Sequence, residues 1–253
     1  MSFDVAAEAY DAFMGRWSRL LSAPFADLAG VRAGQRALDV GCGTGALTAE
    51  LVGRLGADSV TAADPSAPFV GAMRQRFPDV DVREAPAERL PFPDHGFDVT
   101  LAQLVIHFMP DPVAGLREMA RVTRSEGVVA ACVWDHAGQR GPLRDFWAAA
   151  RAVVPDVDDE SELPGTREGH LEELFGAAGL RVIESTALTV TLPLASFEGW
   201  WEPFTHGVGP AGAFVRGLDP GARAELEAEC RRRLPADGSF SLDGVAWAAR
   251  GLA

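Results

Sequence analysis

The chain has 253 residues, of which 47% are hydrophobic and 23% charged, and this balance excludes the disordered and fibrous classes. Asp and Glu total 36 against 23 Lys and Arg, so the formal net charge is -13. Such a surface repels nucleic-acid phosphates and anionic lipid heads, and we expect neither partner. The sequence contains no lysine, which excludes pyridoxal-phosphate Schiff bases and Walker-type phosphate loops.

The three cysteines, Cys42, Cys132 and Cys230, lie far apart in the sequence. Their spacing predicts neither a disulfide framework nor a metal site. The N-terminus lacks a basic region followed by an uncharged apolar run, and no apolar stretch reaches the roughly 18–20 residues of a membrane span. We therefore expect a cytoplasmic protein in a reducing compartment, without a bound metal.

The first half of the chain alternates strand and helix patterns. Apolar residues at three- and four-residue steps over residues 3 to 21 predict an amphipathic helix. Strands are then predicted at Arg36–Val40, Ser59–Asp64, Asp81–Glu84, Phe97–Ala102 and Gly127–Trp134. Helices are predicted between them at Gly45–Leu55, Pro68–Phe77 and Pro112–Arg124. This alternation predicts a parallel sheet with both faces covered.

The second half is less regular. Helices are predicted at Leu143–Val154, His170–Ala178 and Pro220–Leu234, and strands at Arg181–Leu192 and Ser239–Arg250. Residues 155–165, rich in acids and proline, predict an exposed loop. The sequence thus predicts an α/β fold, a doubly wound Rossmann-like, mostly parallel seven-stranded sheet with helices on both faces and a helical cap inserted late in the chain.

A glycine-rich turn, Leu38–Gly45, joins the first predicted strand to a helix. Glycines there let the backbone approach a ligand, and the carboxyl edge of an open parallel sheet is where ligands bind. The spacing Gly41-x-Gly43-x-x-Ala46 also fits a dinucleotide, so an NAD-dependent oxidoreductase stays an alternative. Asp64 ends the second strand and suits a ribose, which both ligands contain. Asp39 favours a ligand with cationic groups over a pyrophosphate.

Leu38–Gly45 resembles the first motif of class I S-adenosylmethionine-dependent methyltransferases. Four further segments are similar to the methyltransferase type 11 group, and the resemblance covers roughly residues 10 to 134; the segments are Ala87–Asp94, Phe97–Val99, His107–Pro112 and Glu118–Val122. The resemblance implies S-adenosylmethionine as the cofactor and in-line methyl transfer to an O, N or C atom of a small organic metabolite. It departs from the group at Pro86, where relatives often carry an acid.

The resemblance also implies roles for single residues. Gly41 and Gly43 would line the methionyl and ribose part, Asp64 would hold the ribose, and Gln103 would face the methionyl end. Ala87, through its backbone N–H, and Glu88 would contact the adenine edge. Tyr10 and Arg16 lie in a segment similar to the N-terminal lid of relatives. Arg16 either pairs with the cofactor carboxylate or is a surface charge.

His107 and His206 are the candidate catalytic bases, because histidine titrates near neutrality. For His107 the alternative is packing beside Phe108. An aromatic wall over the acceptor is predicted from four rings, with packing of the cap on the sheet as the favoured alternative; the rings are Trp134, Trp200, Trp201 and Phe204. His95, His136 and His170 are expected at the surface or in loops.

We expect one methyltransferase domain over residues 1–253. Its predicted parts are a lid helix at about 1–25, a cofactor-binding core at about 30–136, and a C-terminal half, 137–253, that completes the sheet and carries a cap at about 193–235. The partner is expected to be a small molecule, and the protein a monomer or homodimer. Besides the oxidoreductase, a non-methylating protein of this fold, such as a cyclase or binding protein, and a protein-binding module remain alternatives.

Overall fold

The computed structural model describes residues 7–235 and 238–253. It contains one seven-stranded sheet in the order β3-β2-β1-β4-β5-β7-β6. The strands are β1 (Ala37–Val40), β2 (Val60–Asp64), β3 (Asp81–Glu84), β4 (Phe97–Gln103), β5 (Thr123–Trp134), β6 (Arg181–Leu194) and β7 (Phe240–Leu252). Strand β7 pairs antiparallel with β5 and β6, and the other pairs are parallel. The predicted doubly wound, mostly parallel sheet is confirmed.

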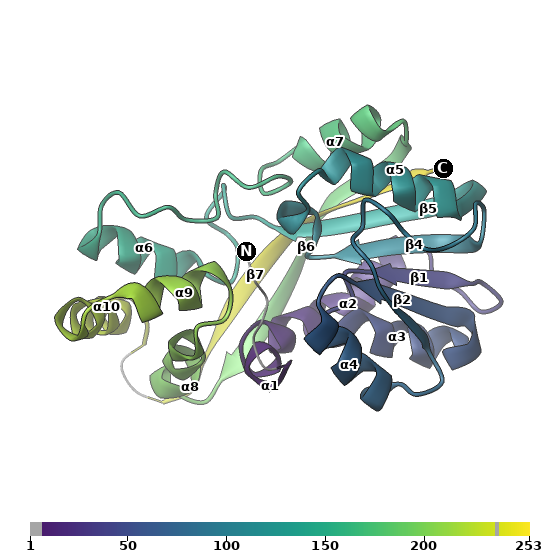
Figure 1. Ribbon diagram of the computed structural model, residues 1–253. Helices are drawn as coiled ribbons and strands as arrows, with labels where there is room; N and C mark the ends of the chain where they lie inside the picture. Colours follow the sequence, from purple (N-terminus) through teal and green to yellow (C-terminus); the bar gives the residue numbers. More distant parts are fainter. Residues whose placement is uncertain (1–6, 236–237) are drawn as a thin grey trace.

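Helices cover both faces of the sheet because β1 and most of β2 and β4 are buried and apolar. Figure 1 shows α5 (Pro112–Val122) and α7 (His170–Ala178) on one face, and α2 (Arg16–Leu28), α3 (Ala46–Leu55) and α4 (Ala67–Arg76) on the other. Two separate apolar clusters fill these two layers. The strand order reverses between β1 and β4, and the helices that follow these two strands, α3 and α5, lie on opposite faces of the sheet (Figure 1), which leaves room for a ligand at this edge.

The N-terminal segment is helical but not uniform. It consists of α1 (Ala7–Tyr10), a π-helical turn η1 (Asp11–Gly15) and α2. The predicted helix began at Phe3, and residues 3–6 lie outside the described residues. It also runs beyond the predicted end at Leu21, through Pro24, because Leu21 and Phe25 on its inner face are fully buried and hold the last turns in place.

Two strands are longer than predicted. Strand β5 begins at Thr123 instead of Gly127, so residues 124–127 belong to the strand and not to a turn before it. Strand β6 continues through Pro193 to Leu194. Proline is tolerated there because β6 is an edge strand, where a missing N–H breaks no ladder on the solvent side.

Helical elements connect β6 to β7 and form the predicted cap. They are α8 (Phe197–Trp201), a 3-10 turn η4 (Glu202–His206), α9 (Gly209–Gly217) and α10 (Pro220–Arg233). In Figure 1 they gather with α6 (Arg144–Val153) at the end of the long β6–β7 pair. Short 3-10 turns also occur as η2 (Ala57–Ser59) and η3 (Ile106–Phe108). Among the described residues, no helix combines the length and the apolar character needed to span a bilayer.

Candidate functional site

Three neighbouring cavities open at the carboxyl edge of β1, β2 and β4, and Tyr10 and Leu104 line all of them. The main cavity has a volume of about 310 Å³. The inner cavity, about 40 Å³, lies beside Asp39 and Gln103. The histidine cavity, also about 40 Å³, lies beside His107 and His136. A shared wall makes these cavities parts of one site.

The glycine turn shapes the floor of the main cavity. Gly41 and Gly43 have φ angles of +70° and +52°, which favour glycine. An added Cβ at Gly41 would stand 2.5 Å from the Val105 side chain, whereas a Cβ at Gly43 would meet nothing within 4 Å. Gly43 itself lines the main and inner cavities. The missing side chain of Gly43 therefore leaves space at the cavity floor.

The charge of the site is negative. Asp64 and Glu88 line the main cavity and Asp39 lines the inner one, and none of the described arginines lines either. The glycine-turn amides of Gly41 and Cys42 donate to Ala63 O, and Gly43 N–H donates to Asp64 Oδ2 at 2.9 Å. A diphosphate needs free N–H groups or cations, so this lining suits a cationic ligand better.

The inner cavity presents two oxygen acceptors. Asp39 is 1% exposed and accepts a 2.6 Å hydrogen bond from Thr48 Oγ1; burial raises its pKa to about 7. The Gln103 amide donates to Ser18 O and Ser22 Oγ, while its Oε1 is buried without a partner. An ammonium group placed here would satisfy Gln103 Oε1 and favour the charged form of Asp39. The residues present thus fit the methionyl end of S-adenosylmethionine.

Asp64 stands where β2 ends, at the wall of the main cavity. Its two oxygens accept from the backbone N–H groups of Gly43 and Ser66, at 2.9 and 2.8 Å. Burial raises the pKa of Asp64, and these two hydrogen bonds oppose the rise. The bonds fix the carboxylate at the cavity wall, and each oxygen keeps a lone pair for a ribose hydroxyl.

The far end of the main cavity is apolar. Pro86, Ala87 and Met109 line it together with Glu88, whose Oε1 accepts from Asp111 N–H at 3.2 Å. The apolar slot suits a flat adenine ring, with the carboxylate of Glu88 at its edge.

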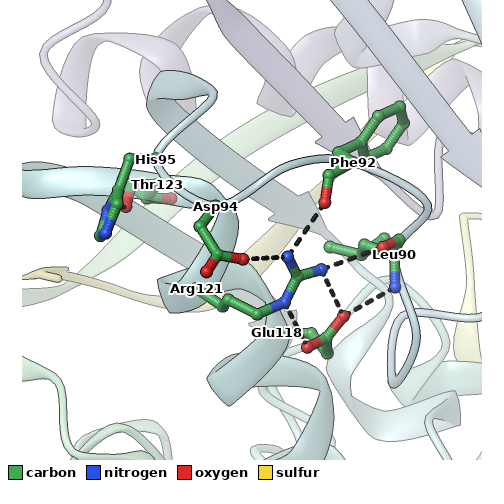
Figure 2. Close-up of polar contacts among 7 residues, drawn as sticks. All are labelled: Leu90, Phe92, Asp94, His95, Glu118, Arg121 and Thr123. Atoms are coloured by element: carbon green, nitrogen blue, oxygen red, sulfur yellow. Dashed lines mark hydrogen bonds and ion pairs between the residues drawn. The ribbon is translucent and has the colours of Figure 1, made fainter.

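A partly exposed polar network holds the segment Leu90–Asp94, which directly follows the Ala87–Glu88 part of the chain (Figure 2). Arg121 donates to both oxygens of Glu118 at 2.7 and 2.8 Å, and to Asp94 Oδ1 at 2.6 Å. Its guanidinium also donates to the carbonyl oxygens of Leu90 and Phe92, and Glu118 accepts from Leu90 N–H. The sequence motifs Ala87–Asp94 and Glu118–Val122 therefore touch, and one guanidinium fork joins them.

Leu104, directly after β4, adopts a left-handed conformation with φ +63°. Its N–H donates to Cys132 O at 2.9 Å, and its side chain is buried against all three cavities. A leucine in this region costs about 1–2 kcal/mol and persists where surrounding contacts impose it. The bend directs the following residues, up to His107, around the end of the sheet.

The histidine cavity contains three buried titratable groups: His107, His136 and Glu160. One ring nitrogen of each histidine and one carboxylate oxygen of Glu160 lie within 4.8 Å of one another. Three such atoms can bind an oxygen atom or a metal ion between them. Burial lowers the pKa of His107 well below its usual range and that of His136 to about 4. Burial raises the pKa of Glu160 to about 7, against the hydrogen bond from Trp147 Nε1 to Glu160 Oε2 at 3.1 Å.

One of these residues differs from the expectation from sequence. His136, expected at the surface or in a loop, lies in the turn after β5 and is 6% exposed. Glu160, from the predicted exposed acidic loop, is only 4% exposed. That prediction was wrong for Glu160 because Trp147 Nε1 on α6 donates a hydrogen bond to its buried carboxylate, and no local pattern signals that contact. The preceding acids Asp156 and Asp158 follow the expectation, because both are exposed.

Several candidate residues lie elsewhere. Arg16 donates to Gly199 O at 3.1 Å and so ties α2 to α8 instead of lining a cavity. His206 is exposed at the end of η4 and lines none of the three cavities. The rings of Trp200, Trp201 and Phe204 are buried against one another and against Phe146, outside the cavity linings. Of the four predicted wall rings, Trp134 alone lines one of these cavities, the histidine cavity.

Comparisons with known proteins agree with this geometry. Residues 38–131 match a family model described as a methyltransferase domain, in agreement with the resemblance of the sequence motifs. A demethylmenaquinone methyltransferase from Mycobacterium sp. (strain KMS) is 44% identical over 103 residues, 41% of this chain and 43% of the relative. A ubiquinone/menaquinone biosynthesis C-methyltransferase from Bdellovibrio bacteriovorus is 38% identical over 104 residues, 40% of this chain and 44% of the relative. The chain thus matches less than half the length of these relatives.

Solved structures share the fold over more of the chain. A SAM-dependent methyltransferase from Aquifex aeolicus has a TM-score of 0.55 and 19% identity, covering 73% of this chain and 93% of the other. The [4+2]-cyclase SpnF has a TM-score of 0.58 and 21% identity, covering 92% of this chain and 80% of the other. At these identities the similarity establishes the fold alone, which hosts both kinds of reaction.

Proposed function

We propose that this chain, whose residues 38–131 belong to the methyltransferase domain family, is an S-adenosylmethionine-dependent methyltransferase. The methyl group moves by in-line displacement to an O, N or C atom of a small organic metabolite. The observation that carries the proposal is the lining of the main and inner cavities, to which the described residues contribute three carboxylates and no arginine. A cationic donor is favoured by that lining, and a dinucleotide is disfavoured.

S-adenosylmethionine supplies an electrophilic methyl group on its sulfonium. Asp39 and Gln103 hold the ammonium end, Asp64 holds the ribose hydroxyls, and the Ala87–Glu88 edge contacts the adenine. Tyr10 and Leu104 line all three cavities, so the donor side and the histidine cavity share this boundary. Rate enhancement then comes mainly from alignment of donor and acceptor, which contributes about 7–11 kcal/mol in well-oriented reactions.

The acceptor side is the histidine cavity, which His107, the candidate base from sequence, lines. Burial lowers the pKa of His107 well below its usual range, so the imidazole is neutral at physiological pH and is a weak base that suits a hydrogen bond to the acceptor. His206 remains a candidate base only if the cap moves. A small acceptor fits the negative surface better than an anionic polymer does.

Calorimetric titration with S-adenosylhomocysteine, S-adenosylmethionine and NAD tests the cofactor. We expect binding of the two sulfur compounds and none of NAD; the reverse result would establish the oxidoreductase alternative. Methyl-labelled cofactor incubated with a metabolite extract then tests the reaction. Cofactor binding without any labelled product, across extracts, would favour a non-methylating protein such as a cyclase.

We also propose a cytoplasmic location and a monomer or homodimer. The three free, buried cysteines support a reducing compartment. Sedimentation of the purified protein measures its mass, and cell fractionation with a tagged chain tests the location.

A further inference from the structure

We propose that His107, His136 and Glu160 form a subsite for an acidic hydroxyl group of the acceptor, with Glu160 taking its proton. The inference rests on the proposed function and adds the acceptor class: a phenol or enol that is methylated on oxygen. Among the described residues, no hydrogen bond joins any two of these three side chains, although one donor atom of each lies within 4.8 Å of the others. Three such atoms leave room for one shared atom between them.

The spacing suits an oxygen atom. A point between three atoms that are at most 4.8 Å apart lies within about 2.8 Å of each, which is the usual length of an O–H···O hydrogen bond. His107 Nδ1 is buried without a partner, and so is Nε1 of Trp134, which lines the same cavity. An indole N–H can only donate, so it satisfies an oxygen and does not ligate a metal ion.

The surrounding walls indicate an acceptor that is apolar apart from this group. Phe13, Leu143 and Val208 line the histidine cavity, as do Pro210 and Ala211 from the start of α9. Among the described residues no arginine lines it, so an acidic or phosphorylated acceptor gains no partner there. At about 40 Å³ the cavity admits the hydroxyl-bearing edge of an aromatic ring, and the rest of the ring would lie against Tyr10, Leu104 and Phe108, which also line the main cavity.

The subsite is next to the donor. Phe108, Tyr10 and Leu104 line both the histidine cavity and the main cavity. His107 follows β4 and His136 follows β5, so both lie at the carboxyl edge where the glycine turn also lies. A hydroxyl held between them is therefore on the acceptor side of the shared wall.

The charges around the cluster favour Glu160 as the proton acceptor. Asp159 raises the pKa of Glu160 and itself pairs with Arg151. Asp135 pairs with Arg140 at 2.5 Å and, like Asp159, acts on His136. Both imidazoles stay neutral through burial, so they can hydrogen-bond the hydroxyl without competing for its proton.

The step is balanced as follows. The acceptor oxygen forms a bond to the methyl carbon while the carbon–sulfur bond breaks, and its electron pair stays on sulfur. The hydroxyl proton passes to the Glu160 carboxylate and leaves to solvent after product release. The products are a methyl ether, S-adenosylhomocysteine and one proton.

The first test uses 4-nitrophenol as the probe, added to the complex with S-adenosylhomocysteine at about pH 7, where a substantial part of Glu160 is ionised. We expect the yellow phenolate band of the probe to grow on binding. Glu160→Gln keeps an oxygen for Trp147 but removes the base, so this growth should be lost. The matched control is Glu162→Gln, because Glu162 is two residues away and exposed. Trp134→Phe removes the N–H and should weaken probe binding severalfold.

The second test uses turnover of a hydroxylated aromatic acceptor. Glu160→Gln should lower kcat at least about a hundredfold, with KM and S-adenosylhomocysteine affinity little changed, and abolish the acidic limb of the pH profile. An equal phenolate band in Glu160→Gln, no probe binding to a complex that binds S-adenosylhomocysteine, or methyl label on carbon or nitrogen would overturn the inference. Stoichiometric Zn²⁺ retained by the wild type and lost in Glu160→Gln would instead establish a metal centre. Failure to bind S-adenosylhomocysteine would refute the proposed function itself.

Discussion

Replacing Asp39 by asparagine tests the electrostatics of the inner cavity. Asp39 is 1% exposed, receives a 2.6 Å hydrogen bond from Thr48, and has a pKa of about 7 because of burial. Asparagine keeps the size and one oxygen acceptor but carries no charge. The substitution therefore isolates the free energy of ionising one buried carboxyl group.

The sign follows from the direction of the pKa shift. The ordinary value is 3.8, and the folded value is higher, so folding favours the protonated form of Asp39. This stabilisation is fully present below pH 3.8, is lost as the pH rises to about 7, and stays lost above that. A shift of this size corresponds to about 4 kcal/mol in the free energy of unfolding.

Urea unfolding of the ligand-free wild type and Asp39→Asn, between about pH 4 and pH 8, measures this effect. The wild type should lose up to about 4 kcal/mol relative to the variant as the pH rises, with a plateau above neutrality. Other titrating groups are common to both proteins and drop out of the difference. Asp79→Asn, at an exposed position, is the control and should show a constant difference. A constant difference for Asp39→Asn as well would refute the reasoning.

Three further outcomes are expected. Gly43→Ala should weaken S-adenosylhomocysteine binding at least about tenfold in calorimetry, because the added methyl group enters the cavity floor and the backbone there has φ +52°. The control is Gly53→Ala within α3, which should leave binding unchanged and stabilise the helix by about 1 kcal/mol. Arg121→Lys should lower cofactor affinity severalfold, because lysine cannot make the several hydrogen bonds that hold the Leu90–Asp94 loop. The control Arg117→Lys, at an exposed position, should leave the affinity unchanged. Equal affinities of the two variants would show that the guanidinium of Arg121 is not needed to hold the loop. Phe204→Ala should lower the free energy of unfolding in urea by about 3–5 kcal/mol, because Phe204 is 1% exposed and its ring centroid lies 4.4 Å from that of Phe146. Cofactor affinity should be unchanged. A loss of acceptor turnover without any loss of stability would instead support Phe204 as a wall of the acceptor pocket.

Local patterns were enough to predict the order of the elements and the place of the cofactor turn. The period of apolar residues is a property of neighbouring positions, so β1, α3 and α7 follow from sequence to within one or two residues. The glycine turn and Asp64 end two such strands, and parallel strands bring their carboxyl ends to one edge. Asp39, Gly43, Asp64 and Gln103 therefore line the cavities as the sequence suggested.

Tertiary structure decided the contacts between distant segments. From the sequence, the cofactor carboxylate was a possible partner of Arg16. In the structure, Arg16 donates instead to Gly199 O of the cap, which lies 183 residues away in the chain. The aromatic rings of α8 and η4 pack on Phe146 of α6, because burial of large rings is favourable wherever apolar partners are close. Nothing in either segment alone distinguishes a core ring from a pocket ring.

The sequence by itself determined the α/β sheet, the glycine turn and the carboxylates at its edge, since these depend on residues a few positions apart. Only the tertiary structure decided that His107, His136 and Glu160 meet. His107 follows β4, His136 follows β5 and Glu160 precedes α7. The buried carboxylate of Glu160 accepts a hydrogen bond from Trp147 Nε1 on α6. Burial lowers the pKa values of the two histidines and raises that of Glu160, because desolvation disfavours the charged form of each group. Neighbouring residues in the sequence cannot predict these shifts, since the burial depends on segments far apart in the chain.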